Sequence, residues 1–194
     1  MKHLLLLSAL LIPLSTNLAA AEKPQKASAQ TTLNLYVTAI EAWDMIQANP
    51  NTLLIDVRDP VEVKFTGFAT PTDIHIPWML AAPDQWNSKK SSWAMRKNPT
   101  FESELLDKLT QLNADKKTSN IIIMCRSGST RSAPAVNLLA KLGYQKVWTV
   151  VDGFEGSKLQ QGDSAGVRAV NGWRNSGLPW SYKVNPDIAW QPHQ

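Results

Sequence analysis

The chain has 194 residues, of which 43% are hydrophobic and 19% are charged, a balance that is ordinary for a globular protein with one well-filled domain. The formal net charge of +4 is small and the basic residues are scattered, so the sequence gives no sign of a nucleic-acid-binding surface. One cysteine excludes an internal disulfide, and one cysteine with three histidines gives no support for a metal site or another cofactor.

The first 21 residues have the pattern of a signal peptide. A short polar start precedes an apolar run from Leu4 to Leu14, and Ala19–Ala21 matches a cleavage site. A membrane anchor is the alternative, but the apolar run is shorter than the ~20 residues that a spanning helix needs. We therefore expect cleavage after Ala21, a periplasmic or secreted location, and a mature chain that is not held in a membrane. Residues 22–32 are polar and lack a periodic apolar pattern, which predicts a flexible leader.

The rest of the chain is predicted to alternate between strands and helices. Short apolar, β-branched runs predict buried strands, and capping signals with helical spacing predict helices between them. The segment 78–98 contains three tryptophans and no regular period, so no element is predicted there. In chain order we expect a strand at 33–37, a helix at 38–48, strands at 52–57 and 74–76, a helix at 101–112, a strand at 121–124, a helix at 132–142 and a strand at 146–151.

This alternation is typical of an α/β fold, with a central, mostly parallel sheet and helices on both faces. We expect one domain over residues 33–184 and a C-terminal tail at 185–194. Ligands of such sheets bind beyond the carboxyl ends of the strands. Cys125 directly follows the predicted strand 121–124, and it therefore lies where a ligand is expected.

The loop that begins at Cys125 carries the clearest chemical signal. Its two arginines supply positive charge, its glycine permits a sharp bend, and its small hydroxyl residues let backbone amides approach a bound anion. A helix start with nearby cations lowers the pKa of a thiol below its usual value of about 8.5, and the thiolate is the reactive form. A buried, inert thiol is the alternative, and the flanking arginines weigh against it. We expect Cys125 to be the nucleophile and the substrate to be held by Arg126, Ser127, Gly128, Ser129, Thr130 and Arg131.

This loop, after its apolar strand, resembles the active-site loop of the rhodanese family of sulfurtransferases. The segment Leu54–Pro60 resembles the family's Asp-Val-Arg segment, and Gly153–Gly156 with Asn171–Trp180 resembles its C-terminal region. The resemblance implies a single-domain, rhodanese-like α/β protein of the exported bacterial type. It also implies that Asp56 and Arg58 support the site without acting directly in the chemistry.

The same resemblance implies a reaction in two steps. Cys125 takes the outer sulfur of an anionic donor such as thiosulfate, becomes a persulfide, and passes that sulfur to cyanide or a thiol. A protein sulfur acceptor is an open alternative.

Two departures from the family pattern bear on substrate choice. The family's usual Gly-His-Ile-Pro turn is represented by Gly67–Pro71, and Ser157–Val170 is an insertion between two C-terminal landmarks. That insertion is expected to be either a lid over the site or a surface excursion.

Two rival functions remain open at this stage. Cys125 and Arg131 also have the Cys-x5-Arg spacing of cysteine-dependent phosphatases and arsenate-type enzymes, in which the arginine embraces the anion. Met124 stands where those enzymes commonly carry histidine, which favours the rhodanese interpretation. The other rival is a periplasmic sulfur carrier or binding module whose acceptor is another protein.

Overall fold

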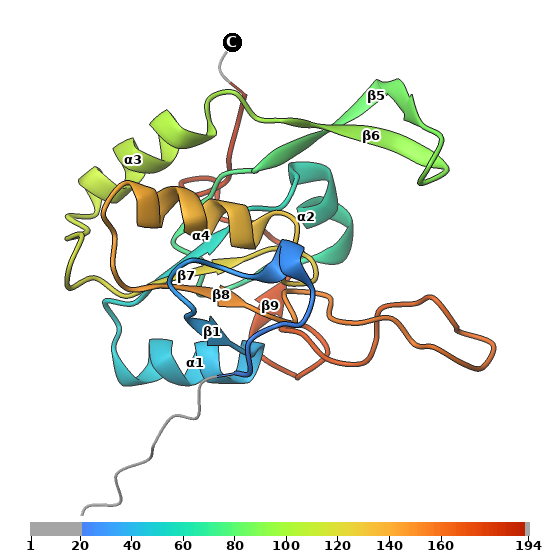
Figure 1. The fold of residues 1–194 in the computed structure, drawn as a ribbon, viewed down its shortest axis with the longest axis horizontal. Coiled ribbons are helices and arrows are strands. Elements are labelled where there is room, and N and C mark those ends of the chain that lie inside the picture. Colours follow the sequence, from blue (N-terminus) through green and yellow to red (C-terminus); the bar gives the residue numbers. More distant parts are fainter. Residues whose placement is uncertain (1–20, 193–194) are drawn as a thin grey trace, which may run out of the picture.

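The computed structural model describes residues 21–192, so the predicted signal peptide, apart from Ala21, lies outside the described residues. A five-stranded parallel sheet in the order β1-β8-β7-β2-β4 forms the centre of the fold (Figure 1). This sheet confirms the predicted α/β class with a central, mostly parallel sheet. Its strands are β1 (Tyr36–Val37), β2 (Leu53–Asp56), β4 (Ile74–His75), β7 (Ile121–Met124) and β8 (Val147–Val150).

Helices cover both faces of the sheet, as predicted (Figure 1). On one face, α3 (Phe101–Gln111) and α4 (Ser132–Lys141) pack against Ile121 and Ile123 of β7. On the other face, α1 (Ala39–Ala48) lies over Ile122. Because successive side chains of a strand point to opposite faces, the unbroken apolar run of β7 fills both cores.

The carboxyl ends of the neighbouring parallel strands β7, β2 and β4 lie side by side, which brings three chain segments together. Asp56 at the end of β2 is in register with Met124 of β7 on one side and with His75 of β4 on the other. The backbone N–H of Val57 donates to Met124 O at 2.9 Å, which continues the pairing to the carboxyl ends of both strands. Cys125 therefore leaves the sheet beside the segment that begins at Arg58.

One α-helix and four strands of the structure lie in segments where the sequence predicted none. Helix α2 (Pro60–Thr66) follows β2, with Asp59 accepting from the Val61 N–H at its start and Pro60 in its first turn. Strand β3 (Phe68–Ala69) pairs with β9 (Trp180–Ser181) in a separate antiparallel ribbon. The segment with three tryptophans contains a hairpin of β5 (Met79–Asn87) and β6 (Ser92–Lys97) that projects from the domain (Figure 1).

The hairpin is largely exposed, and this explains its irregular pattern. Trp86 and Trp93 are each 63% exposed and meet edge to face, with ring centroids 6.4 Å apart. Such a cross-strand aromatic pair stabilises a two-stranded ribbon from within. Because Ala82 is the only fully buried residue of the two strands, alternation between apolar and polar residues is not required, and its usual signal is missing.

Both ends of the described chain contact the domain. Residues 22–32, expected to form a flexible leader, contain a 3-10 helix at Ala27–Ala29 and bury Ala29. The Thr32 N–H donates to Asn137 Oδ1 on α4 at 2.8 Å, which attaches the leader to the domain. The small residues of this segment pack without any regular period, so the sequence pattern missed this contact. Within residues 21–192, no helix combines the length and apolarity needed to cross a membrane.

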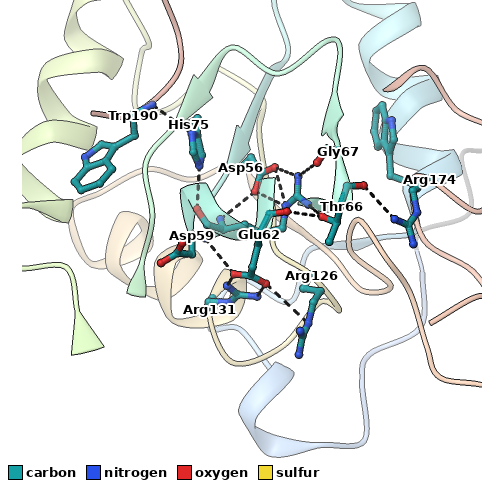
Figure 2. Close-up of polar contacts among 12 residues, drawn as sticks. Asp56, Asp59, Glu62, Thr66, Gly67, His75, Arg126, Arg131, Arg174 and Trp190 are labelled. Atoms are coloured by element: carbon teal, nitrogen blue, oxygen red, sulfur yellow. Dashed lines mark hydrogen bonds and ion pairs between the residues drawn. The ribbon is translucent and has the colours of Figure 1, made fainter. Parts of the chain in front are cut away.

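His75 joins the edge of the sheet to the C-terminal segment. Its Nδ1 accepts from the Trp190 backbone N–H at 3.3 Å, and its Nε2 lies 2.9 Å from Arg58 O (Figure 2). Because Nδ1 accepts, Nε2 carries the proton of the neutral ring and donates to that carbonyl. Burial lowers the pKa of His75 below its ordinary value, although the charge of Asp56 opposes this effect. The tail predicted at 185–194 is therefore attached to the domain through Trp190.

Acid is expected to destabilise the fold through His75. Below about pH 6.5 the unfolded chain binds a proton at this imidazole, whereas the folded chain does so only at lower pH, so the free energy of unfolding falls as the pH drops. Urea unfolding of the wild type and of His75→Gln at about pH 7.5 and about pH 5 measures this effect. The wild type should lose more stability than the variant, and an equal loss in both would contradict the assignment.

Candidate active site

Cys125 lies in the loop between the end of β7 and the start of α4. Its thiol is 2% exposed, and its Sγ is 3.4 Å from the Ser132 hydroxyl. Backbone hydrogen bonding by Ser127 and Ser132 is among the causes that lower the pKa of this thiol. Thr149 on β8 donates to Ser132 Oγ at 2.9 Å, which leaves the Ser132 hydrogen available to a thiolate. The sulfur is thus buried among donors.

These surroundings favour the charged form of the sulfur. Burial by itself raises the pKa of the Cys125 thiol, but the charge of Arg131 and the hydrogen bonds from Ser132 and Ser127 outweigh it and lower the pKa below its ordinary value. A buried thiol without such partners would stay protonated and inert. The geometry therefore has the features of a nucleophile held ready to react.

Gly128 shapes the loop because no other residue fits its position. Its φ is +70°, and a Cβ there would lie 2.0 Å from Val151 O. Both the left-handed backbone and the close approach to the end of β8 require glycine. The glycine expected to permit a bend therefore does so in the structure, where it brings the loop against the end of β8.

Glu62 on α2 binds the two arginines of the loop (Figure 2). Both terminal nitrogens of Arg131 contact its carboxylate, with Nη2 to Oε1 at 2.9 Å, and Arg126 Nε lies 3.9 Å from Oε1. Burial raises the pKa of Glu62, but its bonds to Arg131 lower it overall, so the carboxylate is charged. Arg131 is consequently buried and paired, whereas the Arg126 side chain is 46% exposed.

Glu62 is the residue of the site that the sequence analysis missed. Asp59-Pro60-Val61-Glu62 forms a capping box, in which Asp59 accepts from the helix start and the Glu62 side chain accepts from the Asp59 N–H at 3.1 Å. That pattern predicts a helix directly after β2, with Glu62 in its first turn. Its partner Arg131 is 69 positions away, so their contact has no local sequence signal.

Asp56 and Arg58 form a fully buried ion pair behind the loop. Arg58 Nε donates to both carboxylate oxygens of Asp56 at 3.0 and 2.9 Å, and Arg58 also donates to Thr66 Oγ1 and Gly67 O at 2.9 Å each. Burial raises the pKa of Asp56, and Arg58 lowers it to below its ordinary value. The pair joins β2 to the end of α2, the helix that carries Glu62.

Arg58 also supports the loop from the side of β8. Its guanidinium carbon lies 3.9 Å from the centre of the Phe154 ring, and the Phe154 backbone N–H donates to Cys125 O at 2.8 Å. Arg58 thus contacts neighbours of the nucleophile but not the sulfur itself. This is the position of a supporting residue.

Within residues 21–192, no group of three or more His, Cys, Asp or Glu side chains is placed to hold a metal ion.

The insertion Ser157–Val170 projects from the domain as an exposed arm (Figure 1). Lys158 and Arg168 pair as an antiparallel bridge, and the Leu159 N–H donates to Val167 O at 2.8 Å. The insertion was expected to be either a lid over the site or a surface excursion, and the tip of the arm fits the surface excursion. The base of the arm, however, is bonded to Gly156, and the preceding residues Phe154 and Glu155 donate to the active-site loop.

Ser132→Ala is expected to raise the pKa of the Cys125 thiol by about one unit, the size of one hydrogen bond to a charged group. The rate of alkylation by iodoacetamide as a function of pH measures this pKa. The matched control is Ser103→Ala on the surface of α3, which should leave the thiol pKa unchanged. A Ser132→Ala profile identical to that of the wild type would show that the hydroxyl does not stabilise the thiolate.

Arg58→Met is expected to destabilise the fold by about 3–5 kcal/mol, because it leaves Asp56 charged and buried without a partner. Urea unfolding measures the loss. As a matched control, Arg96→Met breaks the exposed pair with Asp84 and should cost less than about 1 kcal/mol. The double variant Asp56→Asn with Arg58→Met should recover part of the loss, and equal costs for the two single arginine variants would contradict the burial argument.

Comparisons with known proteins agree with this geometry. A match to the family described as "Rhodanese-like domain" covers residues 38–160. Two curated relatives, "Uncharacterized protein RP600 homolog" of Rickettsia rickettsii and "Uncharacterized protein in dnaA 5'region" of Rickettsia montanensis, are each 29% identical over 149 residues. In both cases the alignment covers 75% of this chain and 96% of the relative.

Two solved structures also match. The crystal structure of Rv0390 from M. tuberculosis is 28% identical, with a TM-score of 0.57, and the match covers 75% of this chain and 96% of that one. The polysulfide-sulfur transferase homodimer from Wolinella succinogenes is 20% identical, with a TM-score of 0.44, over 75% of this chain and 77% of that one. The family match spans Cys125, its loop and the Asp56–Arg58 pair. On this evidence the chain belongs to the rhodanese-like domain family, whose general chemistry is sulfur transfer.

Proposed function

We propose that this protein is a sulfurtransferase that moves a sulfane sulfur from a thiosulfate-like donor, through a persulfide on Cys125, to cyanide or a thiol. The observation that carries the proposal is the buried sulfur of Cys125, which lies 3.4 Å from Ser132 Oγ and has a lowered pKa because of the charge of Arg131 and the hydrogen bonding of Ser132 and Ser127. Such surroundings stabilise a thiolate before the reaction and an anionic persulfide after it.

The two steps balance in atoms and charge. The Cys125 thiolate attacks the outer sulfur of thiosulfate, a new S–S bond forms at Sγ, the S–S bond of the donor breaks, and sulfite leaves with the electron pair. Cyanide or a thiolate then attacks the terminal sulfur of the persulfide, and the thiolate of Cys125 is released. The terminal sulfur is negatively charged throughout the intermediate, so we expect the amides of residues 127–131 to hold it.

Glu62 argues against the phosphatase alternative. A Cys-x5-Arg phosphatase needs the paired N–H groups of its arginine for the phosphoryl oxygens. Here both terminal nitrogens of Arg131 contact Glu62, so that arginine acts on the site through its charge and through the shape of the loop.

A sulfur carrier that serves a partner protein would use the same persulfide on Cys125. The sulfurtransferase and the sulfur carrier differ only in the acceptor of that sulfur.

The purified protein is expected to gain the mass of one sulfur atom when it is incubated with thiosulfate, and cyanide should remove that sulfur as thiocyanate. Cys125→Ser should gain none, because its hydroxyl does not ionise near neutral pH. Intact-mass spectrometry measures the adduct, and urea-unfolded wild type is the control for a thiol without its loop. No adduct with thiosulfate or polysulfide, together with hydrolysis of an aryl phosphate, would favour the phosphatase instead.

A further inference from the structure

The hairpin of β5 and β6 carries its tryptophans on the face that is open to solvent. Residues that pair across the two strands point to the same face, as do alternate residues of one strand. Trp93 and Met95 of β6 therefore share a face with Trp86, the cross-strand partner of Trp93. The opposite face includes Ala82, which is fully buried. An antiparallel sheet usually has polar residues on its solvent side, so this hairpin departs from the usual pattern.

Trp86, Trp93 and Met95 form what we call the apolar stripe. The two tryptophans are each 63% exposed although their rings meet edge to face, and Met95 is 37% exposed. Within residues 21–192, neither indole N–H of the stripe has a hydrogen-bond partner, whereas those of Trp173 and Trp190 do. The hairpin stands away from the domain (Figure 1), so no other part of the described chain covers the stripe.

Positive charge is concentrated around the apolar stripe. Residues 79–97 contain four basic side chains and one acidic side chain, so they hold three of the four net positive charges of the whole chain. Arg96 is paired with Asp84, which leaves three lysines. Lys89 and Lys90 lie in the turn beside the tryptophans, and Lys97 follows the stripe at its other end. Within residues 21–192, none of these lysines forms an ion pair within 4.0 Å, so the surface suits a partner with negative charge.

We propose that the apolar stripe and its three lysines dock this protein on the surface of an anionic lipid bilayer. Indole rings favour the headgroup level of a membrane, where the ring contacts apolar chains and the N–H contacts polar groups. Lysines at the same level are attracted to anionic headgroups. Docking of this kind is peripheral and reversible, needs no spanning helix, and is independent of the chemistry at Cys125. The expected release of the mature chain concerns its N-terminal segment, and docking by the hairpin is a separate contact.

Composition and shape favour a bilayer over a protein as the occupant of the stripe. Lysine is depleted at protein–protein interfaces, whereas lysine and tryptophan occur together on segments that lie on membrane surfaces. A protein interface also needs a buried core with a polar rim, about 800 Å² on each partner. A two-stranded ribbon that stands away from the domain provides no such rim (Figure 1). A second copy of this chain is disfavoured, because a symmetric contact between two stripes would bring the lysines of both copies together.

Co-sedimentation with lipid vesicles tests the proposal. The chain that begins at Glu22, the expected product of signal cleavage, is used so that the apolar run Leu4–Leu14 cannot bind lipid. It should bind vesicles of phosphatidylcholine mixed with anionic phosphatidylglycerol at least about tenfold more tightly than vesicles of phosphatidylcholine alone, because each lysine near an anionic surface contributes about fivefold. Added salt should reduce this difference. Cys125→Ser should bind as the wild type does.

Removal of the lysines at the tip assigns the binding to the hairpin. Lys89→Gln with Lys90→Gln should weaken binding to the anionic vesicles about 25-fold, about fivefold for each charge. The matched control is Lys116→Gln with Lys117→Gln, which removes two adjacent exposed lysines from another turn and should change binding less than about twofold. The lysine variant keeps the tryptophan pair, so it tests docking without loosening the ribbon.

Removal of the indoles tests the apolar part of the contact. Trp86→Ser with Trp93→Ser should weaken binding at least about tenfold, because aromatic surface no longer leaves water on docking. Val167→Ser with Val170→Ser, two exposed apolar residues of the arm, is the matched control and should bind as the wild type does.

Three outcomes would overturn the proposal. The first is equal binding to the two kinds of vesicle, or equal losses in the hairpin variants and their controls. The second is no binding to either kind of vesicle, which would leave an acidic protein as the partner. The third is a dimer, measured by light scattering, that the tryptophan variant abolishes, which would assign the apolar stripe to a second copy of this chain.

Discussion

The structure around the site is organised by the cost of burying a negative charge on one sulfur atom. The Cys125 thiol lies at the end of the central strand with 2% of its surface exposed, where burial alone would keep it protonated. Positive charge from Arg131 and hydrogen bonds from Ser132 and the loop amides reverse that preference. The loop, the start of α4 and the end of β8 each supply a part of this environment, so the chemistry depends on the relative positions of all three.

Each charge that stabilises the sulfur is itself held by a partner. Arg131 is held by Glu62 on α2, and the far end of α2 is joined to β2 through Arg58 and Asp56. A buried charge without a partner is costly, so the network is stable only when each pair is complete. The same pairing engages both terminal nitrogens of Arg131, and it makes Arg126, at the exposed side of the loop, the more accessible cation.

The core and the arm contribute differently to the site. Parallel strands and their helices set the position of Cys125, and these are the parts in which the chain follows the general α/β pattern. The arm at residues 157–170 is anchored at its base to the turn Gly153–Gly156, which bonds to the loop, and it is exposed at its tip, so it extends the domain without altering the sheet. Variation in such an arm provides a route to different substrates on one fold.

Local patterns of apolarity, capping and backbone freedom predicted the five strands of the central sheet, helices α1, α3 and α4, the place of Cys125 after a buried strand, and the bend at Gly128. The same patterns missed α2 and the strands of the two ribbons outside the central sheet. The contacts of Glu62 with Arg131, and of the residues before 33 and after 185 with the domain, follow from the tertiary structure alone. Those contacts join residues that are distant in the chain, and their energies depend on packing and burial that no short segment encodes.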